Sequence, residues 1–145
     1  MKPSARSKAR VHALQAIYQW QMTHSAASEI EADFLNGHLH ADTDRAYFHE
    51  LLRDVISHHA ELDQAFSPFL NIPLADLDPI ELAILRIGTH ELTKRPDVPW
   101  RVIINEALEL AKKFASVEGF RFINGVLDPL ARKLRPDETA LPKES

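Results

Sequence analysis

Apolar residues recur along the chain at steps of three and four positions, which is the spacing of one face of an α-helix. No stretch alternates between apolar and polar positions, as a half-buried β-strand does. The first helix is expected from about residue 4 to residue 23. Its inward face is expected to hold Val11, Leu14, Tyr18 and Met22. The pattern predicts an all-α protein.

Polar residues at helix starts divide the next part of the chain. Ser28 and Glu31 have the spacing of a capping box, which predicts a short second helix. Asp42 or Thr43 is expected to cap a third helix. This helix should continue, or stop and restart, up to a proline-containing break at 68–73.

The next helix is the clearest one in the sequence. Asp78 is its expected N-cap, Pro79 occupies its first position and Glu81 its third. Apolar residues cover most of its circumference, which is typical of a helix at the centre of a domain. These residues are Ile80, Leu82, Ala83, Ile84, Leu85, Ile87 and Leu92.

Two more helices complete the predicted fold. One begins at Pro99, and the last runs from about residue 120 to residue 134 after a short link at 117–119. Pro129 predicts a kink or a restart within the last helix. We therefore expect a compact domain of six to seven short helices.

The length of 145 residues fits one domain, which we place at residues 1–135, followed by a disordered tail at 136–145. The chain has no cysteine, which excludes disulfides and thiolate chemistry and fits a reducing compartment. Four glycines leave little material for glycine-rich phosphate loops. No segment is apolar and long enough to cross a bilayer, and we expect a cytoplasmic protein.

Charge is distributed unevenly along the chain. The net charge is −4, yet residues 1–28 carry four basic side chains and no acidic one. A helix start favours acidic residues, so four cations there are unfavourable for a purely structural helix end. A basic arm at residues 1–10 that binds a polyanion explains them better. The four cations are Lys2, Arg6, Lys8 and Arg10.

Catalytic and metal-binding signatures are missing from the sequence. The eight histidines form no H-E-x-x-H pattern, and neither a G-x-S-x-G motif nor a P-loop occurs. Glu106 and Glu109 precede Lys112 and Lys113, and this spacing is typical of a solvated helix face. We expect a protein that is not an enzyme, with no catalytic residue, metal ligand or cofactor.

Two features fit the predicted core poorly. Phe122 lies at the edge of the apolar face of the last helix, beside Arg121. Phe120 and Phe122 could stack on unpaired bases while Arg121 neutralises a phosphate, or Phe122 is peripheral core. Glu81 falls within an apolar sector of its helix, where it either completes the helix start or pairs with a cation of a partner protein.

Five sequence blocks match a known pattern, and on them the chain resembles the NusB family of bacterial transcription antitermination factors along nearly its whole length. The blocks are A-I-L-R-I-G at 83–88, E-L-T-K-R at 91–95, D-V-P at 97–99, I-N-E-A-L-E-L-A-K at 104–112 and F-I-N-G-V-L-D at 122–128. The resemblance implies two small helical bundles and no catalytic activity. It also implies binding of boxA RNA in ribosomal-operon transcripts jointly with the ribosomal protein NusE, in a complex that helps RNA polymerase pass terminators.

The resemblance also assigns site residues. The basic N-terminal motif of the family falls on Arg6, Lys8 and Arg10. The family motif is typically richer in arginine, and this chain has Ser7 and Lys8 within it. A second RNA-contacting region falls on Glu118 to Phe122, and the protein-partner surface falls on Tyr18 and Glu81. We expect the two RNA-contacting segments to form one continuous strip. The RNA-binding residues are thus Lys2, Arg6, Lys8, Arg10, Glu118, Phe120, Arg121 and Phe122.

Other functions remain open at this stage. The chain could be a helical protein–protein adaptor without direct RNA binding, and the partner surface could instead form a homodimer. The same helical domain also occurs fused to RNA methyltransferases, but no nucleotide-binding glycine loop is present here. A transit peptide at the start is disfavoured, because the apolar face of the first helix continues through it.

Overall fold

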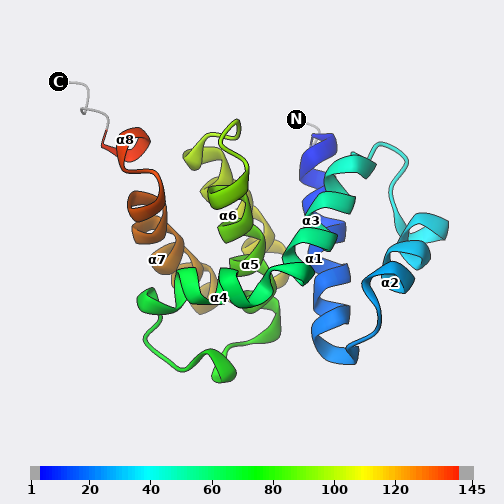
Figure 1. Ribbon diagram of the computed structural model, residues 1–145, viewed down its shortest axis with the longest axis horizontal. Helices are drawn as coiled ribbons and strands as arrows, with labels where there is room; N and C mark the ends of the chain where they lie inside the picture. The colour runs from blue at the N-terminus through cyan, green and yellow to red at the C-terminus, as the bar shows by residue number, and fades with distance from the viewer. Residues whose placement is uncertain (1–3, 141–145) are drawn as a thin grey trace.

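The computed structural model describes residues 4–140, apart from the side chain of His38, and all regular structure within them is helical (Figure 1). The elements are α1 (Ala5–Thr23), α2 (Ala27–Asp33), η1 (Phe34–His38), α3 (Arg45–Ser57), α4 (His59–Phe66), η2 (Ser67–Phe69), η3 (Leu74–Asp76), α5 (Pro79–Lys94), α6 (Trp100–Phe114), α7 (Val117–Leu134) and α8 (Pro136–Thr139). The all-α prediction is confirmed. Within this part of the chain, no helix is long and apolar enough to cross a membrane.

Helix α5 joins two small bundles. Figure 1 shows α1, α2 and α3 on one side of it and α7 and α8 on the other, and α6 packs against both α5 and α7. Helix α5 packs against α1, α3, α4, α6 and α7, and its side chains from residue 83 to residue 92 are all buried. The apolar circumference therefore correctly predicted a central helix, because such a helix is stable only when every face is covered.

The buried part of α5 also carries polar groups, and most of them have partners. Arg86 donates to both carboxylate oxygens of Asp63 on α4, at 2.9 and 2.8 Å. Gly88 lets α7 approach closely, since a Cβ at this position would lie 3.1 Å from a methyl group of Leu127. The core thus combines apolar packing with hydrogen-bonded ion pairs between helices.

Two of the predicted caps are wrong. Helix α2 begins at Ala27 without a side-chain cap, and Ser28 lies inside it. Helix α3 is capped by Asp44, whose carboxylate accepts the N–H of Tyr47 at 3.0 Å. Asp42 does not cap the helix because it pairs with Lys8 of α1. Tertiary contacts chose among neighbouring residues with similar capping ability.

The start of α5 is as predicted. Asp78 accepts the N–H groups of Ile80 and Glu81 at 3.0 and 3.1 Å, and Pro79 is the first helical residue. Local hydrogen bonding alone decides this helix end, which explains why the sequence predicts it.

Helix α7 differs from the prediction at both of its uncertain points. Residues 117–119 form its first turn and not a link, because Ser116 accepts the N–H of Gly119 at 2.9 Å. The helix also continues through Pro129. The proline frees the carbonyl of Gly125 four residues earlier, and Gly125 is exposed, so water can satisfy that group.

The chain stays ordered beyond residue 135. Glu138 in α8 accepts the N–H of Trp100 at 2.8 Å and pairs with Arg135 at 3.0 Å. Arg135 also donates to the carbonyls of Leu92 and Arg95 at 3.1 and 2.7 Å. The predicted tail at 136–145 is therefore wrong for 136–139, which are helical, while 141–145 lie outside the described residues.

Candidate RNA-binding and partner surfaces

The first two turns of α1 carry three of the four cations singled out in the sequence. Ser4 caps the helix by accepting the N–H of Ser7 at 3.0 Å, and the first turn contains no acidic residue. Lys2 lies outside the described residues. Arg6, Lys8 and Arg10 are all described, and they have three different environments.

Arg6 is the most available of the three cations. Its side chain is 41% exposed, and its guanidinium lies 4.5 Å from the centre of the Tyr47 ring. Asp44 and Asp97 each approach it at 3.9 Å, which is too long for a hydrogen bond. Stacking on Tyr47 orients Arg6, yet its N–H groups stay free to donate to a phosphate.

Lys8 is held by an acidic residue. Its Nζ lies 2.7 Å from Oδ2 of Asp42, in the segment between η1 and α3. The hydrogen bond and the charge of Lys8 lower the pKa of the Asp42 carboxyl. A phosphate must therefore displace Asp42 before it can use this ammonium group.

Arg10 is buried, unlike its two neighbours. It is 4% exposed and donates to both carboxylate oxygens of Glu91 at 2.9 and 2.8 Å, and to Glu106 at 2.8 Å. Burial opposes the charge, but the hydrogen bonds and charge of Glu91 raise the pKa of Arg10 further above its ordinary value. Its guanidinium is not accessible to solvent, so the expectation of a phosphate contact is corrected. Arg10 instead fixes the start of α1, which carries Arg6 and Lys8, to α5 and α6.

Tyr47 on α3 connects these groups, and no sequence signal pointed to it. The guanidinium groups of Arg6, Arg10 and Arg95 lie 4.5, 5.3 and 5.1 Å from its ring centre. Its hydroxyl donates to Glu91. Burial, followed by the nearby negative charge of Glu91, raises the pKa of Tyr47, so the hydroxyl keeps its proton.

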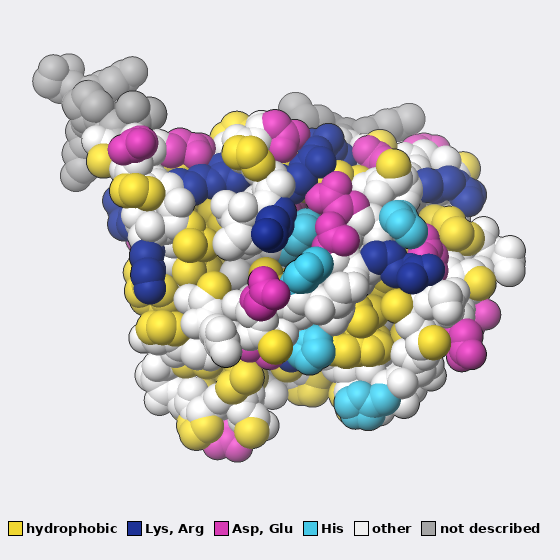
Figure 2. Space-filling model, in the orientation of Figure 1, with side chains coloured by type: hydrophobic (Ala, Val, Ile, Leu, Met, Phe, Trp, Pro, Cys, Tyr) yellow, Lys and Arg dark blue, Asp and Glu magenta, His cyan; other side chains and the backbone are white. Residues whose placement is uncertain are grey.

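Glu106 also departs from its predicted role. It accepts hydrogen bonds from Ser7 and Arg10 across the gap between α1 and α6, whereas Glu109 pairs with Lys112 at 3.5 Å on the solvated face as expected. A shallow hollow of about 290 Å³ lies between the two helix starts. Basic and acidic side chains alternate there, and Figure 2 shows a similar mixture of dark blue and magenta side chains on the face it presents.

The start of α7 carries the second predicted segment. Glu118 and Arg121 are exposed, and Arg121 has no acidic partner among the described residues. Phe120 and Phe122 are half-buried and pack against the core, so each leaves part of its ring accessible. Phe122 is thus peripheral core that stays partly accessible, a position between the two predicted ones.

The two predicted RNA-contacting segments lie near opposite ends of α1. Gln21, near the end of α1, donates to the carbonyl of Pro79 at 2.8 Å, and the neighbouring Glu81 approaches Gly119 of α7. The start of α7 therefore lies near the end of α1 that is opposite Arg6. Fifteen residues of α1 span about 22 Å between the two ends. An RNA that touches both segments must run along this length.

Glu81 and Tyr18, the predicted partner residues, lie toward the α7 end. Both are half-buried. Glu81 has no cationic partner among the described residues, and burial, followed by the charge of Asp78, raises the pKa of its carboxyl. A Cβ on Gly119 would lie 2.7 Å from Oε2 of Glu81, so a larger residue at this position would require the Glu81 carboxylate to rotate away. An unpaired, half-buried carboxylate is suited to a cation supplied by another molecule.

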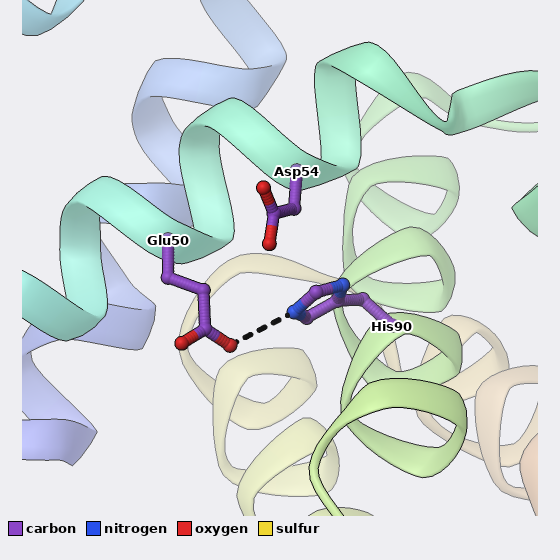
Figure 3. Close-up of side chains that lie close together, drawn as sticks. All are labelled: Glu50, Asp54 and His90. Carbon is purple, nitrogen blue, oxygen red and sulfur yellow. Dashed lines mark hydrogen bonds and ion pairs between the residues drawn. The ribbon is translucent and has the colours of Figure 1, made fainter.

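One group of described side chains could hold a metal ion. Glu50 and Asp54 on α3 and His90 on α5 place one ligand atom each within 4.8 Å of one another (Figure 3). The sequence did not indicate this group, because His90 lies on a different helix, far along the chain from the two acidic residues.

Comparisons with known proteins identify relatives over most of the chain. The NusB family model matches residues 7–132. The transcription antitermination protein NusB of Idiomarina loihiensis is 52% identical over 94% of this chain and 98% of its own. The protein of the same name from Alcanivorax borkumensis is 50% identical over 95% and 92%.

Two solved structures share the fold. One is a crystal structure of the antitermination factors NusB and NusE in complex with double-stranded RNA, with a TM-score of 0.79, 23% identity, and coverage of 89% of this chain and 97% of that one. The other is T. maritima NusB, with a TM-score of 0.79, 25% identity, and coverage of 97% and 100%.

Proposed function

The chain belongs to the NusB family of transcription antitermination factors, which is not a family of enzymes, and from this premise we propose that it binds boxA-type single-stranded RNA jointly with NusE. Bound in this way within the antitermination complex, it helps RNA polymerase read through terminators, notably in ribosomal RNA operons. Its action takes place in the cytoplasm, where the nascent transcript and a ribosomal protein are both available.

The observation that carries the RNA-binding proposal is the state of Arg6. Its guanidinium is exposed, oriented by the ring of Tyr47, and beyond hydrogen-bond distance of both neighbouring carboxylates. Lys8 lies in the same part of α1 and becomes available once Asp42 is displaced. These two cations, with Lys2, attract the phosphate backbone, while Arg10 holds the turn in place.

The start of α7 supplies contacts of a different kind. The accessible parts of Phe120 and Phe122 can stack on unpaired bases, while Arg121 and Glu118 offer a donor and an acceptor beside them. The NusB protein of similar fold was solved with double-stranded RNA and NusE. Stacking on ring faces requires unpaired bases, which favours a single strand for this segment.

The NusE contact is proposed at Glu81 and Tyr18. A half-buried carboxylate without a cationic partner gains most when a lysine or arginine of a partner reaches it. Met22 on α1 and Val117 on α7 are 54% and 68% exposed, and they supply apolar surface at the same end of the molecule. A homodimer through this surface would compete with NusE.

The decisive experiment is filter binding of a short boxA-like RNA, with and without NusE, over a series of salt concentrations. We expect NusE to raise the affinity, and a single strand to bind more tightly than its duplex. If about four phosphates are neutralised, the slope of log affinity on log salt should be near −3, from about 0.7 per contact. A scrambled RNA is the control.

Two outcomes would redirect the proposal. NusE binding that depends on Glu81, with no retention of RNA at any salt concentration, would identify a protein–protein adaptor. Equal RNA affinity with and without NusE would remove joint recognition while keeping direct RNA binding. A homodimer would give an apparent mass in solution that rises with protein concentration. Addition of NusE would lower the fraction of dimer.

A further inference from the structure

A surface hollow of about 540 Å³ lies between α3, α4 and α5, and its lining includes none of the residues assigned above to RNA and NusE. Glu50, Asp54 and His90 line it, and Figure 3 shows the Asp54 carboxylate directed toward the His90 ring. His90 is 1% exposed, and its Nε2 lies 3.1 Å from Oε2 of Glu50. One buried imidazole nitrogen and two carboxylate oxygens thus face one another across two helices.

The acidic partners of His90 differ in how they are held. Oε1 of Glu50 accepts from Arg95 at 3.2 Å, which orients the carboxylate and leaves Oε2 directed at His90. The Asp54 carboxylate has no hydrogen-bond or ion-pair partner within the part of the chain that the structure describes. The half-buried Asp54 carboxylate therefore keeps its oxygen atoms available to a further ligand.

The distances and ligand types suit a small divalent ion. Zinc bonds to histidine nitrogen and carboxylate oxygen at about 2.0–2.2 Å, so tetrahedral ligands lie about 3.4 Å apart. The three ligand atoms lie within 4.8 Å of one another, and small rotations of the two carboxylates would close the difference. Imidazole favours zinc and similar transition metals over magnesium and calcium, which prefer oxygen ligands alone.

We propose that Glu50, Asp54 and His90 form a binding site for a divalent transition-metal ion of the zinc class, with its remaining coordination position open to the hollow. Glu50 and Asp54 lie one turn apart on α3, so both can reach the same ion. The bound metal would fasten α3 to α5 and stabilise the junction of the two bundles. None of the three ligands is among the residues assigned above to RNA or NusE.

The test is calorimetric titration of the full, chelator-treated chain with zinc chloride, together with thermal unfolding with and without zinc. We expect one zinc ion per chain and a rise in melting temperature, since the ion binds only the folded state. Asp54→Asn should weaken zinc binding at least about tenfold. Cobalt(II) should give visible absorption bands that are lost in His90→Gln.

The control is His58→Ala, because His58 is exposed and lines the same hollow without belonging to the three ligands. It should bind zinc as the unaltered chain does. His90 is buried, so His90→Gln counts only if its circular dichroism is unchanged, and Asp54→Asn tests the site independently. No zinc binding by the unaltered chain, or full binding by a folded Asp54→Asn variant, would overturn the proposal.

Discussion

Arg10 of α1 and Glu91 of α5 form a bidentate ion pair in the protein interior, with N–O distances of 2.9 and 2.8 Å. The two side chains are 4% and 1% exposed. The same Glu91 carboxylate accepts the hydroxyl of Tyr47, the residue on which Arg6 stacks. This buried pair therefore fixes the platform from which the exposed arginine can bind RNA.

Replacement of Arg10 should mainly affect stability. Arg10→Ala leaves the Glu91 carboxylate buried without its cation, which costs about 3–5 kcal/mol of unfolding free energy. Urea denaturation measures this loss. Arg6→Ala is the control, because the exposed and widely spaced ion pairs of Arg6 contribute no more than about 1 kcal/mol to the unfolding free energy. Equal stability of the two variants would contradict the anchoring role of Arg10.

Replacement of Arg6 and Lys8 should affect RNA binding with little change in stability. The double variant Arg6→Ala/Lys8→Ala removes two phosphate contacts, so the salt slope should become shallower by about 1.4. Filter binding over a salt series measures it. Lys133→Ala, which removes an exposed charge near the end of α7, should leave the slope unchanged. An unchanged slope in the double variant would exclude these cations from the interface.

Asp42 should act as a competitor of RNA for Lys8. Asp42→Asn frees the ammonium group, and because an exposed ion pair is weak, RNA affinity should rise only modestly, by about two- to fivefold. Glu109→Gln makes the same change of net charge at another exposed pair. If both variants gain equally, the effect comes from net charge and not from the release of Lys8.

The half-buried Glu81 carboxylate should lower the stability of the isolated protein, although it favours binding of the partner. Its raised pKa means that the folded state binds the proton more tightly than the unfolded chain does, so stability decreases as the pH rises through that pKa. Glu81→Gln should therefore be more stable than the unaltered chain at neutral pH, with a difference that shrinks in acid. Urea denaturation at several pH values tests this.

The same variant should bind NusE more weakly at neutral pH, because it lacks the carboxylate for a partner cation. Glu109→Gln should change neither property. Higher stability without any loss of NusE affinity would mean that Glu81 has no partner there.

Two glycines should respond oppositely to replacement by alanine. At Gly88 a Cβ would lie 3.1 and 3.2 Å from the methyl groups of Leu127, which is fully buried, so Gly88→Ala should destabilise the protein by about 1–3 kcal/mol. At Gly125 no atom lies within 4 Å, and alanine should stabilise by about 0.5–1 kcal/mol through helix propensity. Thermal unfolding compares them. Stabilisation by Gly88→Ala would show that α5 and α7 can separate at little cost.

Features with a local cause could be predicted from the sequence. The start of α5 depends on Asp78 and its own following N–H groups, and the burial of this helix follows from its apolar circumference. The cap of α3 could not be predicted, because Asp42, Thr43 and Asp44 are chemically similar and Lys8 of another helix pairs with Asp42. Where a residue far along the chain can pair with one of several candidate caps, the local sequence does not distinguish between those candidates.

The candidate site divides in the same way. The cations of α1 and the aromatic residues of α7 are visible in the sequence, as is their chemistry. Only the tertiary structure decided that Arg6 is exposed while Arg10 is buried, and that Tyr47 lies between them. Apolar spacing determines helices because its interactions lie within a few residues, whereas burial and ion pairing depend on how those helices pack, and hence on residues far apart in the chain.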